Sequence, residues 1–232
     1  MKTLSTSNFA ARFLTAVALV ALLAWPMDAE AQFFKKKENR YTDPYKGFTE
    51  EAYMDMDFLP NTSTPEVHKK AKSGVKKTIR ALAEQLKNKV TVDLVRDDEV
   101  VLVTFPTDDL FLPNDTMLTT EGTALLAPLL PHMKNPMMYK IVLAVHTDDT
   151  GSELYRDELS TSRLNSVYDW FMLAVESGQI QENLIIIPFA MSSTMPLADN
   201  NTRDNRALNR RLEVYFIPGP QLIDEAYKGQ LK

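Results

Sequence analysis

The sequence predicts an α/β fold, more specifically an α+β sandwich in which one mixed sheet is covered by helices. Apolar runs of strand length alternate with longer amphipathic segments, the connections are short, and a strand-like run closes the order. The chain has 232 residues, of which 44% are hydrophobic and 25% are charged, which suits one soluble domain with attached segments.

Residues 64–98 are expected to form an amphipathic helix followed by the first strand of a hairpin. Thr64 is suited to cap a helix, and Pro65 to occupy its first turn. Apolar residues then recur near helical spacing, among many lysines. A basic amphipathic helix can lie on a membrane surface, but packing on the domain's own sheet requires no further partner and is the favoured interpretation.

The rest of the domain is predicted from apolar periodicity and from the breaks between runs. The apolar runs 90–95 and 100–105 flank the polar pair Asp97-Asp98, which indicates a β-hairpin. Further helices are expected at residues 118–130 and 153–177, and further strands at residues 139–145, 184–187 and 211–217. From the strand at residues 100–105 onward the expected order is βαβαβ(α)β, preceded by the amphipathic helix and the first hairpin strand.

Both ends of the chain are expected to lie outside the domain. Residues 1–31 have the pattern of a secretory signal peptide, with basic residues, an apolar run too short to span a membrane, and an Ala-Glu-Ala cleavage site. Residues 32–63 are predicted to be an extended linker, and residues 218–232 a polar tail. Cleavage would leave no transmembrane segment and would place the mature protein in the periplasm.

Composition argues against several functional classes. The net charge of −5 and the pI near 5.3 argue against nucleic acid as a partner. The chain contains no cysteine, which rules out disulfides, thiolate metal sites, catalytic thiols and a cysteine-linked lipid. The three histidines are scattered, and no phosphate-binding glycine loop is present. We therefore expect no metal, no cofactor and no enzymatic activity; a triad of His146, Asp148 and Ser160 lacks a nucleophile-elbow sequence.

Three motifs follow one another in residues 99–217. His146-Thr147-Asp148 ends a predicted strand, Leu159-Ser-Thr-Ser-Arg163 lies on the next helix, and Asn209-Arg-Arg211 precedes the last strand. This succession resembles the OmpA-like C-terminal domain family, which includes outer membrane protein A, the peptidoglycan-associated lipoprotein and MotB. The resemblance implies a peptidoglycan-binding domain.

The resemblance also implies a set of ligand-binding residues. Asp148 and Arg163 match the family's aspartate and arginine, which hold the ammonium and the carboxylate of meso-diaminopimelate. That division of roles is chemically reasonable, because a guanidinium binds a planar carboxylate through two parallel hydrogen bonds. Thr147 would orient the ligand beside Asp148, Arg210 matches a position that lines the site, and Asn114 matches a further contributor.

Two features qualify this site. Arg156 stands where the family usually has an asparagine that faces the ligand, so ligand preference could differ. Without the motifs, Asp148 and Arg163 would be interpreted as an ordinary surface salt bridge.

The predicted function is that of a non-catalytic periplasmic protein, peripherally associated with the outer membrane. It would bind the diaminopimelate of the wall stem peptide and tether an envelope component to the cell wall. The alternative is a scaffold with a degenerate OmpA-like domain, which would contact other envelope proteins through residues 32–88.

Overall fold

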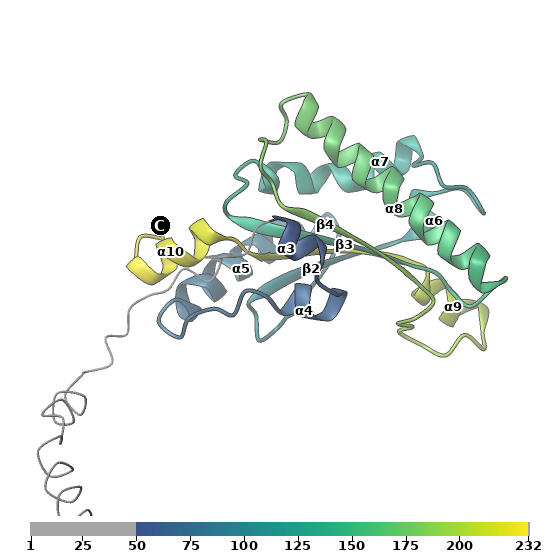
Figure 1. Ribbon diagram of the computed structural model, residues 1–232, viewed down its shortest axis with the longest axis horizontal. Helices are drawn as coiled ribbons and strands as arrows, with labels where there is room; N and C mark the ends of the chain where they lie inside the picture. Colours follow the sequence, from purple (N-terminus) through teal and green to yellow (C-terminus); the bar gives the residue numbers. More distant parts are fainter. Residues whose placement is uncertain (1–49, 232) are drawn as a thin grey trace, which may run out of the picture. The chain divides into compact units, whose positions relative to one another are not determined.

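The computed structural model describes residues 50–231, which form a five-stranded sheet with helices (Figure 1). The predicted signal peptide and residues 32–49 of the predicted linker lie outside the described residues. The strands are β1 (Thr91–Val95), β2 (Val100–Pro106), β3 (Tyr139–His146), β4 (Ile186–Ser192) and β5 (Arg211–Pro218). The helices are α3 (Glu50–Met54), α4 (Phe58–Ser63), α5 (Lys72–Leu86), α6 (Thr107–Leu110), α7 (Thr120–Leu126), the 3-10 helix η1 (Ala127–Met133), α8 (Glu153–Glu176), α9 (Arg203–Asn209) and α10 (Pro220–Lys228).

The sheet is mixed, as predicted, with the strand order β1-β2-β5-β3-β4. β1 and β2 form the expected antiparallel hairpin, in which Val95 pairs with Val100. The last strand, β5, lies antiparallel between β2 and β3, whereas β4 runs parallel to β3. This arrangement places the end of β3 next to the start of β5, because His146 pairs with Arg211.

One face of the sheet is apolar. The pairing register places alternate residues of three neighbouring strands on it, and all of them are buried. They are Val101, Val103, Phe105, Leu212, Val214, Phe216, Ile141, Leu143 and Val145. α5 packs on β1 and β2, η1 contacts α5, and α8 packs on β3 and β4. The lysine-rich helix therefore buries its apolar side within the domain, which confirms the favoured interpretation of that helix.

The opposite face of the sheet, here called the polar face, carries Lys140, His146, Arg211, Glu213 and Tyr215 among apolar residues, and the segment that contains α3 and α4 covers it. In Figure 1, α4 lies on the other side of the strands from α8. Tyr53 and Asn61 are fully buried in this segment, and the ring of Phe58 packs edge-on against those of His146 and Tyr215. The prediction of an extended linker is therefore wrong for residues 50–63, because the polar sheet face needs a cover that supplies hydrogen-bond partners.

The helix predicted from Thr64 begins later. Thr64 has an extended backbone and ends α4, and its carbonyl accepts a hydrogen bond from the buried Lys140. α5 therefore starts only at Lys72. A buried partner elsewhere in the chain outweighs the local preference of Thr64-Pro65 for starting a helix.

The polar-tail prediction for residues 218–232 is also wrong. Residues 220–228 form α10, in which Leu222 and Ile223 are fully buried, and this helix packs on α5. The remaining elements follow the predictions with shifted bounds. β4 continues through Pro188, which is tolerated on an edge strand, and the helix expected at residues 118–130 changes to a 3-10 helix in a proline-containing stretch.

We expect Gly122→Ala to lower the free energy of unfolding by about 1–3 kcal/mol, because α7 approaches α6 too closely for a side chain. A Cβ atom at Gly122 would lie 2.5 Å from the carbonyl oxygen of Leu110 and 2.8 Å from its Cα. Urea denaturation measures the effect, with the exposed Glu121→Ala on the same helix as the control. Equal stability of the two variants would contradict the prediction.

Candidate functional site

A cavity of about 570 Å³ opens at the end of the sheet where β3 finishes. The loop after β3, the first turns of α8, the segment that follows β2, and the region from α9 to the start of β5 all contribute to it. Figure 1 shows α6, α9 and the beginning of α8 at this same end of the domain. All six residues predicted from the sequence line this cavity: Asn114, Thr147, Asp148, Arg156, Arg163 and Arg210.

Asp148 is a buried carboxylate with fixed partners. Its Oδ1 accepts a hydrogen bond from the backbone of Thr150 at 2.9 Å, and its Oδ2 accepts one from Arg210 at 2.6 Å. Burial by itself raises the pKa of this carboxyl, but the bonds from Arg210 and Thr150 outweigh burial and lower the pKa below 3.8. Asp148 therefore presents a negative charge to the cavity at neutral pH.

Arg210 bridges two carboxylates. Besides Asp148 it binds Asp108, through Nε at 2.8 Å and through a terminal nitrogen at 2.5 Å. The bond to Asp108 raises the pKa of Arg210 above its ordinary value. Asp108 was not among the predicted site residues, because it lies 102 positions from Arg210 and no motif connects them.

Arg163 is buried, with 4% of its surface exposed, and is held by the segment that follows β2. Its Nε donates to the carbonyl oxygen of Asp115 at 2.9 Å and one terminal nitrogen donates to Thr107 Oγ1 at 3.3 Å. The guanidinium lies over the ring of Phe111, 4.9 Å from its centroid. Burial lowers the pKa of Arg163, although carboxylates such as Asp108 oppose the shift.

Asp148 and Arg163 do not pair with each other among the described residues, since the ion pair of Asp148 is with Arg210. The interpretation as an ordinary surface salt bridge is therefore wrong. Two oppositely charged groups instead line one cavity, each oriented by other parts of the chain. They are available to a ligand that carries both charges.

The remaining predicted residues differ in how they are held. The Thr147 side chain is buried, and its Oγ1 has no hydrogen-bond partner within residues 50–231. Arg156 donates to the carbonyl oxygens of Gly151 at 2.6 Å and of Asp149 at 3.2 Å. Asn114 accepts a hydrogen bond from the Tyr155 hydroxyl at 3.1 Å, which connects two walls of the cavity.

No family model matches the chain, but individual known proteins are similar to it. Outer membrane protein A of Bordetella avium is 28% identical over 211 residues, which cover 90% of this chain and 97% of that protein. The outer-membrane lipoprotein YfiB of Pseudomonas aeruginosa is 39% identical over 75 residues, which are 32% of this chain and 42% of YfiB. The match therefore spans less than half of that lipoprotein.

A solved structure agrees with the fold. The structure of a MotB-like protein from Desulfovibrio vulgaris superposes with a TM-score of 0.54 at 19% identity, over 64% of this chain and 95% of that one. The chain is therefore similar in sequence to outer membrane protein A and in fold to a MotB-like protein. The fold predicted from the motifs is confirmed.

The region before the last strand is braced by hydrogen bonds within its own loop. Asn209 is fully buried and makes a hydrogen bond with each polar atom of its amide. Its Oδ1 accepts from the backbone of Leu197 and Ala198, and its Nδ2 donates to Ala198 and Asn200. Arg206 also braces this loop by donating to the carbonyl of Asn200 at 2.9 Å, yet it lines the cavity too.

The histidine of the His146-Thr147-Asp148 motif faces away from the cavity. His146 is buried on the polar sheet face, with its Nε2 3.3 Å from Glu213 Oε2. Ser160 donates to the carbonyl of Asp157 at 3.1 Å. The arrangement required for a triad of His146, Asp148 and Ser160 is therefore not present in these residues.

Residues 50–231 contain no cluster of three metal-ligating His, Cys, Asp or Glu side chains, and none of their helices is long and apolar enough to span a membrane.

Proposed function

We propose that this OmpA-like domain binds the stem peptide of peptidoglycan, without catalysis, and thereby tethers an envelope component to the cell wall. The observation that carries the proposal is the cavity itself, in which an ionised buried carboxylate and a buried guanidinium come from different elements. The protein is periplasmic and envelope-associated, in keeping with outer-membrane relatives such as YfiB.

The ligand group we propose is the free end of meso-diaminopimelate, which carries one ammonium and one carboxylate on the same carbon. Arg163 would bind the carboxylate, because its guanidinium is held in place and has no carboxylate bonded to it among the described residues. Asp148 would attract the ammonium. The buried Thr147 hydroxyl, which lacks a protein partner in residues 50–231, would complete the site with a hydrogen bond.

Asp148→Asn is expected to weaken binding of a diaminopimelate tripeptide by more than about tenfold. The substitution keeps the shape of the side chain and removes the negative charge that the ammonium requires. Isothermal titration calorimetry on the mature protein measures the effect. Arg163→Lys is expected to have a similar effect, because lysine keeps the charge but loses the paired N–H groups that match a carboxylate.

The matched control is Asp157→Asn, which neutralises an exposed carboxylate on α8. A second control is the same tripeptide with lysine in place of diaminopimelate, which keeps an ammonium but lacks the carboxylate beside it. If the wild-type protein bound neither peptide, or bound both equally, the proposed recognition of diaminopimelate would be wrong.

A further inference from the structure

The charged side chains around the cavity do not balance. Five guanidinium groups and two carboxylates line it, a formal excess of three positive charges. Both carboxylates, those of Asp108 and Asp148, are bonded to Arg210. The other four arginines, Arg156, Arg163, Arg203 and Arg206, therefore line the cavity without a carboxylate bonded to any of them within residues 50–231.

A zwitterion would not neutralise this excess. The free end of diaminopimelate has no net charge, so its binding between Asp148 and Arg163 would leave the other guanidiniums as they are. Positive groups gathered in a concave site concentrate the field and attract an anion. The excess positive charge of the cavity therefore favours a ligand that carries at least one negative group in addition to the zwitterion.

Three of these arginines stand apart from the predicted zwitterion site. Arg203 begins α9 and is exposed at the cavity, and its side chain has no hydrogen bond or ion pair within the described residues. Arg206 follows on the same helix and uses one terminal nitrogen to brace Asn200. Arg156 approaches from α8, and its buried Nε has no partner among the described residues. The N–H groups of arginines on two helices, α8 and α9, are therefore available to a ligand in the same cavity.

We infer that Arg203, together with Arg206 and Arg156, binds a second carboxylate of the wall peptide, outside the diaminopimelate zwitterion. This inference rests on the proposed function. A stem tripeptide offers two such groups: the α-carboxylate of its γ-linked D-glutamate and the carboxylate at its C-terminus. Either would form a charge-assisted hydrogen bond with a guanidinium. The domain would then discriminate between wall peptides with free carboxylates and those in which they are amidated.

The test compares three tripeptides by calorimetry on the mature protein: the unmodified one, one amidated at the D-glutamate α-carboxyl, and one amidated at the C-terminus. Amidation of the carboxylate that the arginines bind is expected to weaken binding by about tenfold. Amidation of the other one is expected to change little. The weaker of the two amidated peptides thereby identifies the carboxylate.

The variant Arg203→Gln connects the effect to the arginines, and it should fold normally because Arg203 is exposed and unbonded within the described residues. We expect Arg203→Gln to bind the unmodified peptide about tenfold more weakly than the wild type does. It should bind the peptide amidated at the carboxylate that the arginines contact with the same affinity as the wild type. Lys69→Gln, an exposed cation away from the cavity, is the matched control.

The outcomes separate the two proposals. Equal binding of all three peptides, with Arg203→Gln unaffected, would overturn the second carboxylate site and leave the proposed function standing. Absence of any binding to the unmodified tripeptide would overturn both. If the lysine-containing peptide bound as well as the diaminopimelate peptide while amidation still weakened binding, the second carboxylate site would stand and the zwitterion site would fail.

Discussion

Lys140→Met is expected to lower the free energy of unfolding by about 3 kcal/mol, because it removes the donor for two buried acceptors and one part-buried acceptor. Lys140 is fully buried, and its Nζ donates to the carbonyl and side-chain oxygens of Asn61 at 2.7 and 2.9 Å and to the carbonyl of Thr64 at 2.7 Å. The same nitrogen lies over the ring of Tyr53, 4.1 Å from its centroid. Every one of these partners belongs to the segment that covers the polar sheet face.

The protonation of Lys140 is balanced between two effects. Burial lowers its pKa from 10.5 to about 7, and the nearby Arg96 adds to the shift. The three oxygens match the three N–H bonds of an ammonium and oppose it. Methionine has a similar length and no donor, so it fills the space while leaving the oxygens unsatisfied.

Two measurements check this prediction. Urea denaturation gives the loss of stability, and hydrogen exchange is expected to show faster exchange of the amides in residues 50–64 than elsewhere in the domain. Lys134→Met, an exposed lysine, is the control. Unchanged protection of residues 50–64 would mean that Lys140 does not hold this segment.

Glu213→Gln is expected to remove much of the acid sensitivity of the domain. Glu213 is buried and accepts hydrogen bonds from Arg211 and the Tyr215 hydroxyl, both at 2.7 Å, and His146 lies 3.3 Å away. Burial by itself raises the pKa of Glu213, but the bonds and charges of these three residues outweigh it and lower the pKa from 4.5 to about 2.

The sign of the pH effect follows from this direction. Because the pKa of Glu213 is lower in the folded protein than in the unfolded chain, its ionised form stabilises the fold fully above about pH 4.5. That stabilisation, about 3 kcal/mol, is lost as the pH falls toward 2. Glu213→Gln should therefore be less stable than wild type at pH 7 and nearly equal to it at pH 2.

Chemical denaturation at a series of pH values between 2 and 7 measures this convergence. Glu158→Gln, which removes an exposed carboxylate on α8, should parallel the wild type throughout. A constant gap between Glu213→Gln and the wild type at all pH values would show that the carboxylate is not the group that titrates.

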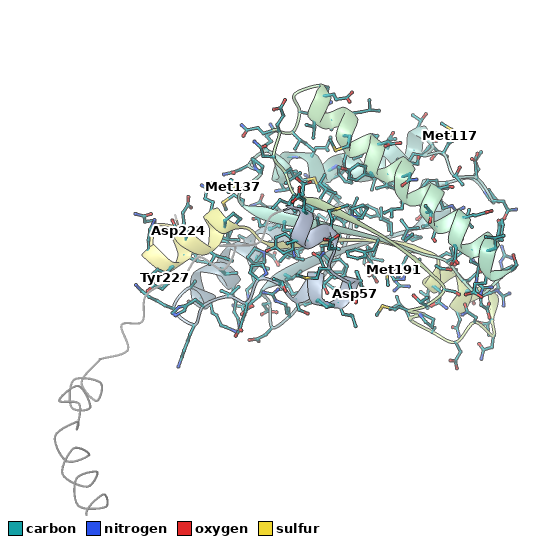
Figure 2. The ribbon with its side chains drawn as sticks, viewed as in Figure 1. Asp57, Met117, Met137, Met191, Asp224 and Tyr227 are labelled. Carbon is teal, nitrogen blue, oxygen red and sulfur yellow. The ribbon has the colours of Figure 1, made fainter. Side chains whose placement is uncertain are left out.

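Both predictions concern the polar sheet face, and that face adjoins the candidate site. His146 directly precedes Thr147 and Asp148, and Arg211 directly follows Arg210. Successive strand residues point to opposite faces of the sheet. The buried contacts among His146, Arg211 and Glu213 therefore hold in place the strand ends from which the cavity residues project. Figure 2 labels two exposed apolar side chains, Met117 and Met137, which lie far apart on the domain.

Local pattern predicted the strands of the sheet and the two longest helices, α5 and α8. β3 is a continuous apolar run because it is buried on both faces, and α8 matches its predicted bounds to within one residue. The motifs brought Asp148, Arg163 and Arg210 into one expected site, and the structure places all three at one cavity. Each of these signals is contained within a short stretch of chain.

The helices and site residues that were not predicted depend on contacts between residues far apart in the sequence. Residues 50–63 form helices whose oxygen atoms accept hydrogen bonds from the buried Lys140, and residues 220–228 form a short amphipathic helix whose apolar side packs on α5. Asp108 and Arg203 could not be predicted as site residues, since only the folded chain brings them to the cavity. The apolar runs that become strands and the motif residues were predictable from the sequence, because each depends on neighbours in the chain. The cover of the polar face and the charge of the cavity were not, because both depend on residues that only folding brings together.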